Sequence, residues 1–110
     1  MTEPGSVVVV ATLVPLPGRE AEVEAVLREA VPATHAQDAG CELYALHRSV
    51  RGKEGFVMIE KWASAEALGA HGAGPAFAAL SAGLDGLLAE PLGVTVLEPL
   101  AAGDEKLGRL

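Results

Sequence analysis

The feature that most constrains the fold is the run SVVVVATLV, which extends from Ser6 to Val14. β-Branched residues at successive positions favour a strand, and apolar residues on both of its sides indicate that both faces are covered. Pro15, Pro17 and Gly18 end the run. The chain therefore has to contain a sheet, with something packed on each side of this strand.

Helical spacing follows directly. Between Arg19 and Val31 the apolar residues recur three and four positions apart, with glutamates between them; Pro32 interrupts the pattern, and Ala39-Gly40 ends the segment. Ser64 is a plausible N-cap for a short helix over 65–71. A longer helix is predicted to begin near Pro75, to carry its apolar face as far as Leu88 and to end at 90–91.

Three further strands are predicted, over 41–49, 56–62 and 92–97. The order strand, helix, strand, strand, helix, strand predicts an α+β fold of the ferredoxin-like split βαβ type, with a four-stranded antiparallel sheet and helices on one face. Strands 7–14 and 56–62 are apolar on both faces, and monomers rarely expose large apolar patches. We therefore expect a homodimer in which two sheets pack together.

Length and charge narrow the class of protein. A chain of 110 residues is expected to form one domain over 7–99, between an N-terminal tail (1–6) and a polar C-terminal tail (100–110). A net charge of −7 argues against nucleic-acid binding. No apolar run reaches the roughly 20 residues that span a membrane, and no basic leader opens the chain. With one cysteine and no secretory signal, a cytoplasmic location is expected.

Three segments carry a family resemblance. They are ATLVPLPGREAEVEA, VPATHAQDAGCELYALHR and FVMIEKWASAEALGAHGAGPAF, and their most specific parts are Gly40-Cys41, Glu60-x-Trp62 and Ala70-His71 before Pro75-x-Phe77. Together they resemble the antibiotic-biosynthesis monooxygenase domain family over about residues 7–97. The resemblance implies a dimeric α+β barrel that oxidises electron-rich aromatic compounds with O₂ as co-substrate and with no metal or organic cofactor.

The family is functionally mixed, so fold alone does not decide the reaction. Its haem-degrading members use an asparagine, a tryptophan and a histidine, where this chain places Ala11, His71 and Ser81; haem degradation is therefore not expected. Many quinol-oxidising relatives carry a histidine after the equivalent of Pro75, where this chain has Ala76. His71 is then the main candidate for a catalytic base.

His71 lies at the end of a predicted helix, beside a glycine-rich break. An unperturbed imidazole titrates near pH ~6.5, which suits removal of a proton from a quinol or phenol. The structural alternative is a histidine that interacts with the last carbonyl groups of its helix.

A planar substrate needs flat, apolar walls. The rings of Trp62, Tyr44 and Phe77 can supply them, together with Met58, which shares a strand face with Trp62. The alternatives are that Trp62 and Phe77 anchor the core, and that Tyr44 faces the dimer interface.

Glu60 alternates with Met58 and Trp62, so its carboxylate lies on an apolar side of the strand. It is expected either to pair with Arg48 or His47 across the sheet, or to support a base in the pocket.

The remaining candidates have simpler interpretations. His35 and His47 are expected to be ordinary, and Cys41 to be a packed small residue. No spacing of histidines and cysteine indicates a metal site. The glycines around His71 form either a mobile lip over a pocket or a plain turn.

Three functions fit these observations. The first is a cofactor-independent monooxygenase that oxidises a quinol or a polyketide-like phenol or anthrone, with a small aromatic molecule as its substrate. The second is a dimeric protein that binds a small molecule without catalysis. The third is an oxygen-independent isomerase on the same scaffold.

Overall fold

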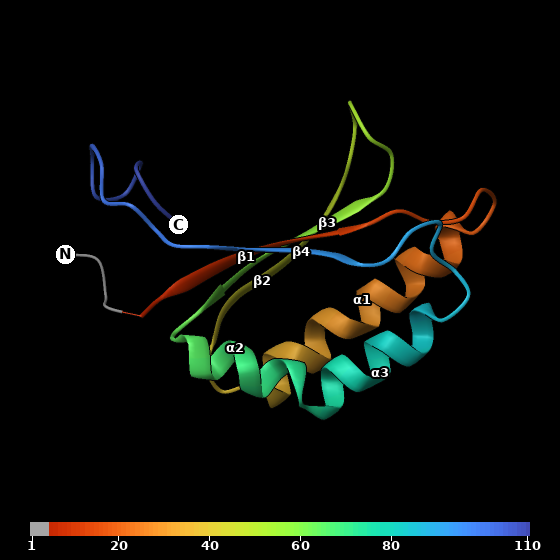
Figure 1. Cartoon of the computed structure of the whole chain (residues 1–110), viewed down its shortest axis with the longest axis horizontal. Coiled ribbons are helices and arrows are strands. Elements are labelled where there is room, and N and C mark those ends of the chain that lie inside the picture. Colours follow the sequence, from red (N-terminus) through yellow and green to blue (C-terminus); the bar gives the residue numbers. More distant parts are fainter. Residues whose placement is uncertain (1–4) are drawn as a thin grey trace.

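The structure is a computed structural model that describes residues 5–110. It contains, in chain order, β1 (Val7–Leu13), α1 (Glu20–Gln37), β2 (Cys41–Arg48), β3 (Phe56–Trp62), α2 (Ala65–Gly72), α3 (Pro75–Leu84) and β4 (Gly93–Leu97). The four strands form one antiparallel sheet in the order β2-β3-β1-β4, and the three helices lie on one side of it (Figure 1). The predicted α+β class, the ferredoxin-like strand order and the four-stranded sheet are confirmed.

The core lies between the sheet and the helices. Alternate residues of β1 and β3 point toward the helices, and the largest of these side chains are fully buried, among them Leu13, Met58 and Trp62. Helix α1 contributes Val23 and Leu27, neither of which is exposed to solvent. The apolar residues that recur at every second position of the strands and at every third or fourth position of the helix thus pack together in one apolar layer.

Helix α1 ends close to the predicted Ala39-Gly40 but is not interrupted at Pro32. It continues through Pro32 to Gln37, although proline lacks the N–H that an interior helical residue donates. Ala30 and Thr34 on either side of the proline are both buried against the rest of the molecule. Tertiary packing of this face outweighs the local preference to end the helix, so the predicted interruption at Pro32 is wrong.

Helix α3 is shorter than predicted and ends at Leu84. Gly86 follows with φ = +75°, a left-handed conformation that glycine adopts readily and that ends helices. The next residues pair with the end of β1 instead: the Leu16 N–H donates to the Leu87 carbonyl at 2.8 Å, and the Ala89 N–H donates to the Val14 carbonyl at 2.7 Å. Leu87 and Leu88 therefore belong to a connection that leads into β4.

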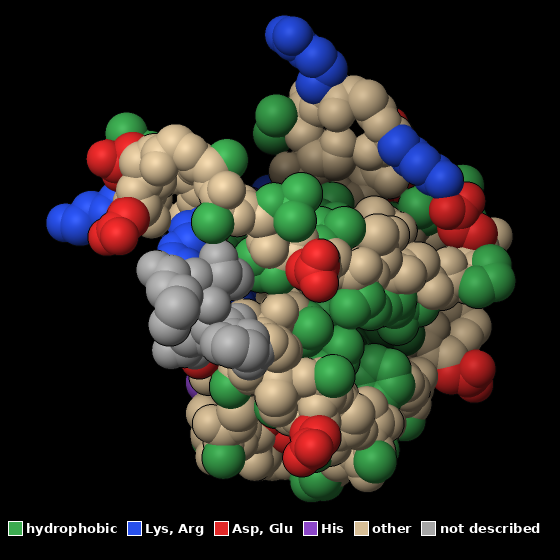
Figure 2. Space-filling model, turned by 60° about the vertical axis from the view of Figure 1, so that its left-hand side comes forward, with side chains coloured by type: hydrophobic (Ala, Val, Ile, Leu, Met, Phe, Trp, Pro, Cys, Tyr) green, Lys and Arg blue, Asp and Glu red, His purple; other side chains and the backbone are tan. Residues whose placement is uncertain are grey.

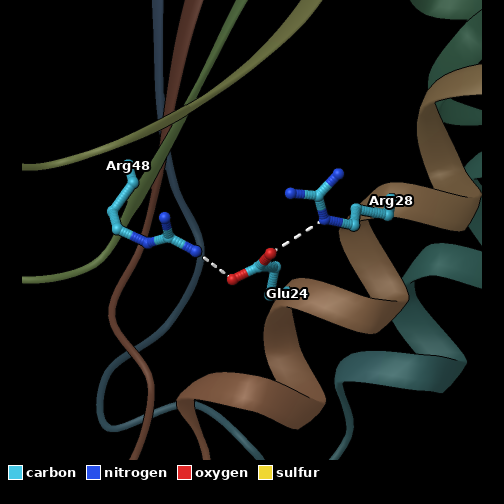
Figure 3. Close-up of polar contacts among 3 residues, drawn as sticks. All are labelled: Glu24, Arg28 and Arg48. Carbon is cyan, nitrogen blue, oxygen red and sulfur yellow. Dashed lines mark hydrogen bonds and ion pairs between the residues drawn. The ribbon is translucent and has the colours of Figure 1, made fainter.

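A surface ion-pair cluster joins α1 to the end of β2. The Glu24 carboxylate accepts hydrogen bonds from Arg28, one turn along α1, and from Arg48 on β2 (Figure 3). The hydrogen bond from Arg28, followed by that from Arg48, lowers the pKa of the Glu24 carboxyl. Exposed ion pairs of this kind contribute little to stability, but the cluster shows that the Arg48 guanidinium pairs with Glu24.

The side of the sheet opposite the helices is apolar at its centre. Ile59 on β3 pairs in register with Val10 on β1 and with Ala45 on β2, and all three are half-buried. Among residues 5–110, no helix covers this side (Figure 1). In the same range, no helix is long and apolar enough to cross a membrane.

Candidate functional site

A cavity of about 220 Å³ lies between the sheet and the helices. Its walls come from all of the strands and helices, and most of its lining side chains are apolar. The lining residues are Val9, Ala11, Leu13, Leu27, Tyr44, Met58, Glu60, Leu68, His71, Gly72, Phe77, Leu80, Leu92 and Val94. Only Tyr44, Glu60 and His71 among them carry polar side chains. The face drawn in Figure 2 shows hydrophobic side chains gathered in and around a hollow, with acidic side chains scattered about it.

His71 forms one wall of this cavity and is 4% exposed. Its Nδ1 lies 2.8 Å from Oδ2 of Asp38, and both side chains are almost completely buried. The Asp38 backbone caps the C-terminus of α1, while His71 lies in the last turn of α2. The ends of two helices thus bring a carboxylate and an imidazole together.

Gly40 makes this approach possible. A Cβ atom at position 40 would lie 2.3 Å from the Cβ of Ala67 on α2, closer than two carbon atoms can pack. The absence of a side chain lets α2 lie directly against the α1–β2 turn that carries Asp38. At the start of α2, the Ser64 hydroxyl accepts a hydrogen bond from the Ala67 N–H at 3.0 Å, so the predicted N-cap is confirmed.

Three aromatic rings surround the imidazole of His71. The Trp62 ring lies 4.6 Å from it, centroid to centroid, at an interplanar angle of 33°. Tyr44 and Phe77 both meet it edge-on, each at 5.4 Å. These contacts hold the imidazole in one plane, so the direction in which its second nitrogen points is fixed by packing as well as by Asp38.

Glu60 is the second buried polar group of the cavity, at 5% exposure. Its Oε1 accepts a hydrogen bond from the Trp62 indole N–H at 2.9 Å. Burial raises the pKa of the Glu60 carboxyl above its ordinary value, whereas the Trp62 hydrogen bond and the nearby His71 act in the opposite direction. The predicted pairing with Arg48 or His47 is wrong: Arg48 binds Glu24, and the exposed His47 contacts only the Ala45 carbonyl within the described residues.

Tyr44 lies on β2 opposite Glu60 and points toward the helices, where it is 3% exposed. The alternative that places it at a dimer interface is therefore wrong. Burial first, and then the Glu60 carboxylate, raise the pKa of its hydroxyl, so the phenol stays protonated. The hydroxyl shares a hydrogen bond with the Thr34 side chain, and the Tyr44 carbonyl contacts Nε2 of His35 at 3.1 Å.

The other sequence-predicted residues divide between the cavity and its support. Met58 and Phe77 line the cavity. Trp62 does not line it; its fully buried ring lies behind His71 and Glu60. Cys41 is half-buried at the edge of the core, and burial raises the pKa of its thiol, which disfavours the thiolate. Within residues 5–110, no group of three or more His, Cys, Asp or Glu side chains is arranged to hold a metal ion.

Asp38 was not among the residues singled out from the sequence. It stands at the end of a helix in an ordinary acidic chain, and nothing in its local pattern distinguishes it from Asp85 at the end of α3. The sequence clue that could have pointed to it is Gly40, two residues further on, because a glycine at a close contact marks where another element approaches.

Fold and site together define a class: a small ferredoxin-like α+β protein with an apolar cavity between sheet and helices and a buried Asp–His pair in its wall. The model of the family described as "Antibiotic biosynthesis monooxygenase" matches residues 6–83. The chain belongs to this family, and its family membership indicates a monooxygenase-like role.

Individual proteins similar to this chain support the same family. The chain is 37% identical over 100 residues to a Mycobacterium tuberculosis protein named "Putative monooxygenase Rv0793", with 91% of this chain and 95% of that protein covered. The solved structure of Rv0793 superposes with a TM-score of 0.81 at 32% identity, covering 91% of this chain and all of that one. The structure of a Caulobacter crescentus protein described as a "putative antibiotic biosynthesis monooxygenase" gives a TM-score of 0.81 at 31% identity, with 88% of this chain and 92% of that one covered. The structure of protein PA3566 from Pseudomonas aeruginosa gives a TM-score of 0.80 at 30% identity, with 92% of this chain and 100% of that one covered.

Proposed function

We propose that this protein is a cofactor-independent monooxygenase that oxidises a small quinol, or a related phenol or anthrone, with O₂. The observation that carries the proposal is the buried Asp38–His71 pair in the wall of an apolar cavity. A base held by a carboxylate, beside an apolar space with aromatic walls, is what the first step of such a reaction requires.

The first step is removal of a hydroxyl proton from the substrate. With Asp38 accepting the proton of Nδ1, the tautomer that fits leaves Nε2 unprotonated and able to act as the base. When Nε2 takes the substrate proton, the imidazole becomes positively charged, and the adjacent Asp38 carboxylate stabilises that charge. The aromatic contacts around the ring keep Nε2 in place while this happens.

The second step is electron transfer from the substrate anion to O₂. The phenolate gives one electron to O₂, which leaves a substrate radical and superoxide, and these combine to form a carbon–oxygen bond. The resulting peroxide loses its C–H proton as the O–O bond breaks, and water leaves. The sum for a hydroquinone is one quinol and one O₂ giving one hydroxyquinone and one water; for an anthrone, the CH₂ group becomes C=O with release of one water.

The cavity suits this chemistry because few of its lining groups are polar. Its lining is apolar apart from three polar side chains, and charges inside such a space interact more strongly than they do in water. Tyr44 and Phe77 provide flat surfaces near His71. Together these features support a planar aromatic substrate.

The proposal includes a homodimer formed through the outer side of the sheet. Val10, Ala45 and Ile59 lie side by side there, and half-buried apolar residues at the centre of a sheet favour a covering layer. A second copy of the chain, packed sheet to sheet, would cover this surface without obstructing the cavity on the helix side.

The test is O₂ uptake by the purified protein with a reduced naphthoquinol and without added metal or flavin. We expect one O₂ consumed per quinol above the rate of autoxidation, with one labelled oxygen atom from ¹⁸O₂ in the product. Simple autoxidation would instead release H₂O₂, and catalase would then return O₂. The His71→Ala variant should lose the activity, whereas His47→Ala, on the exposed edge of β2, serves as the matched control.

The competing functions give different outcomes. A binding protein would bind the quinol without O₂ uptake, and an isomerase would convert its substrate equally well in the absence of O₂. Full activity in His71→Ala would remove His71 from the mechanism.

A further inference from the structure

Glu60 is a buried carboxyl that the proton-transfer step does not use. It lines the same cavity as His71, it is 5% exposed, and the Trp62 indole N–H donates to its Oε1. Within residues 5–110, no lysine or arginine forms an ion pair with it. A carboxylate buried without a cation is costly to keep, and buried polar groups ordinarily have all of their hydrogen-bonding capacity used.

The second carboxylate oxygen, Oε2, has no hydrogen bond from the protein among the described residues. The Trp62 N–H is a single donor and is already used at Oε1. Tyr44, which pairs in register with Glu60 on β2, interacts through its hydroxyl with Thr34, and no hydrogen bond joins it to Glu60 among the described residues. A donor for Oε2 therefore has to come from what occupies the cavity.

The cavity then offers two acceptors, and the Tyr44 hydroxyl is the one O–H group among its lining side chains. Nε2 of His71 is one acceptor, since Nδ1 is directed to Asp38, and Oε2 of Glu60 is the other. All other lining side chains except Tyr44 are apolar. A ligand that satisfies both acceptors must carry two O–H groups on one flat, apolar frame.

We propose that Glu60 is the second hydroxyl acceptor of the cavity, so that the protein selects aromatic substrates with two hydroxyl groups, one bound by His71 and the other by Glu60. This inference rests on the proposed function and, among the quinols, phenols and anthrones named there, it assigns Glu60 the selection of quinols and other dihydroxyaromatic compounds. A cavity of about 220 Å³ is below the roughly 300–1,000 Å³ typical of pockets for drug-sized ligands, so one or two fused rings fit better than three or four.

The same arrangement discriminates between the reduced and the oxidised ligand. A quinol and its quinone have nearly the same shape, but the quinol has two O–H donors and the quinone has two carbonyl acceptors. A quinone carbonyl that faces Oε2 would place two acceptors together and leave both unsatisfied. Since a hydrogen bond to a charged group changes affinity by roughly 10- to 150-fold, the quinol should bind at least 10-fold more tightly than the quinone.

The test is anaerobic binding of 1,4-naphthoquinol and 1,4-naphthoquinone, measured by calorimetry or by fluorescence of Trp62, the single tryptophan of the chain. In Glu60→Gln the amide oxygen can still accept from Trp62, while its NH₂ group points a donor into the cavity. We expect the wild-type preference for the quinol to fall by 10-fold or more, or to reverse in favour of the quinone. Glu42→Gln, which removes a carboxylate of the neighbouring strand that pairs with Lys61 outside the cavity, should leave the preference unchanged.

The outcomes separate this inference from the proposed function. If the quinol binds with a preference that depends on Glu60 but no O₂ is consumed, the inference stands and the monooxygenase proposal falls. If O₂ is consumed while Glu60→Gln keeps the wild-type preference, the role of Glu60 is overturned and the monooxygenase proposal stands. If the wild-type protein does not bind the quinol at all, the proposed role of Glu60 is also overturned. Circular dichroism and thermal melting show whether Glu60→Gln is folded.

Discussion

Replacing Asp38 with asparagine tests the proton-transfer step most directly. The change keeps the size and shape of the side chain but removes the negative charge that lies 2.8 Å from Nδ1 of His71. Both groups are at least nine-tenths buried, so water screens their interaction little. At an effective dielectric constant of roughly 20, unit charges at this separation attract each other by about 6 kcal/mol, which is the upper limit of what Asp38 can contribute once His71 is protonated.

The observable loss should be smaller than that limit. Asparagine still offers a carbonyl acceptor to Nδ1–H, and general acid–base catalysis as a whole contributes typically 10²- to 10⁴-fold. We therefore expect kcat for quinol oxidation in Asp38→Asn to fall by about 10²- to 10³-fold, equivalent to about 3–4 kcal/mol. KM should change by less than about 3-fold, because Asp38 contacts the base and does not line the cavity.

The assay is steady-state O₂ uptake at saturating quinol, corrected for autoxidation. Asp85→Asn is the matched control, because Asp85 also caps the C-terminus of a helix but has no histidine partner among the described residues. A kcat in Asp38→Asn within 3-fold of wild type would refute the role of the Asp–His pair. A large rise in KM at unchanged kcat would show instead that Asp38 supports binding rather than catalysis.

Three further predictions concern stability and assembly. The pKa of the Glu60 carboxyl is raised in the folded state, so the native state holds its proton to higher pH than the unfolded state does and the free energy of unfolding falls as pH rises above about 4.5. His71 and Tyr44 are the other titratable groups of the cavity that Glu60 lines. Thermal melting of Glu60→Gln should show a stability advantage over wild type that grows as the pH rises above about 4.5, and a constant difference would contradict the assignment. Gly40→Ala should cost about 1–3 kcal/mol in urea unfolding because its Cβ meets α2 at 2.3 Å, whereas Gly69→Ala, with no atom within 4 Å, should stabilise by about 0.5–1 kcal/mol. Ile59→Lys, at the centre of the outer sheet face, should give a monomer by light scattering where the wild type gives a dimer; a monomeric wild type would refute the proposed interface.

The fold could be predicted from the sequence because its determinants are local. The strand 56–62 is observed at the predicted residues, because its run of apolar and aromatic residues lies between a charged loop that contains glycine and the helix N-cap Ser64. The errors occurred where packing at a distance overrides local preference. Pro32 does not end α1, because residues on both sides of it are held in the core, and α3 ends early because Gly86 leads Leu87 into contact with the end of β1.

The candidate site could be predicted only in part, and the reason is physical. Glu60 could be singled out because a carboxylate on an apolar side of a strand is unusual in itself. His71 could be singled out from its place beside a glycine-rich break and from the family resemblance, and Tyr44 because the chain has few aromatic rings. The partners of these side chains could not be predicted from the sequence. Asp38 reaches His71 across 33 positions of the chain, and the pairing of Glu60 with Trp62, rather than with a cation across the sheet, depends on which side of the sheet each side chain occupies.

Trp62 connects the two polar halves of the site. Its indole N–H holds one oxygen of Glu60, while its ring packs against the imidazole of His71, so one rigid side chain sets the positions of both proposed hydroxyl contacts. The aromatic ring of a substrate would then be held by two groups that cannot move independently. A hydrogen bond contributes more to affinity when its protein group is already held in place before the ligand binds. Trp62, buried behind the cavity, therefore favours selectivity for the substrate more than it would by contacting the substrate directly.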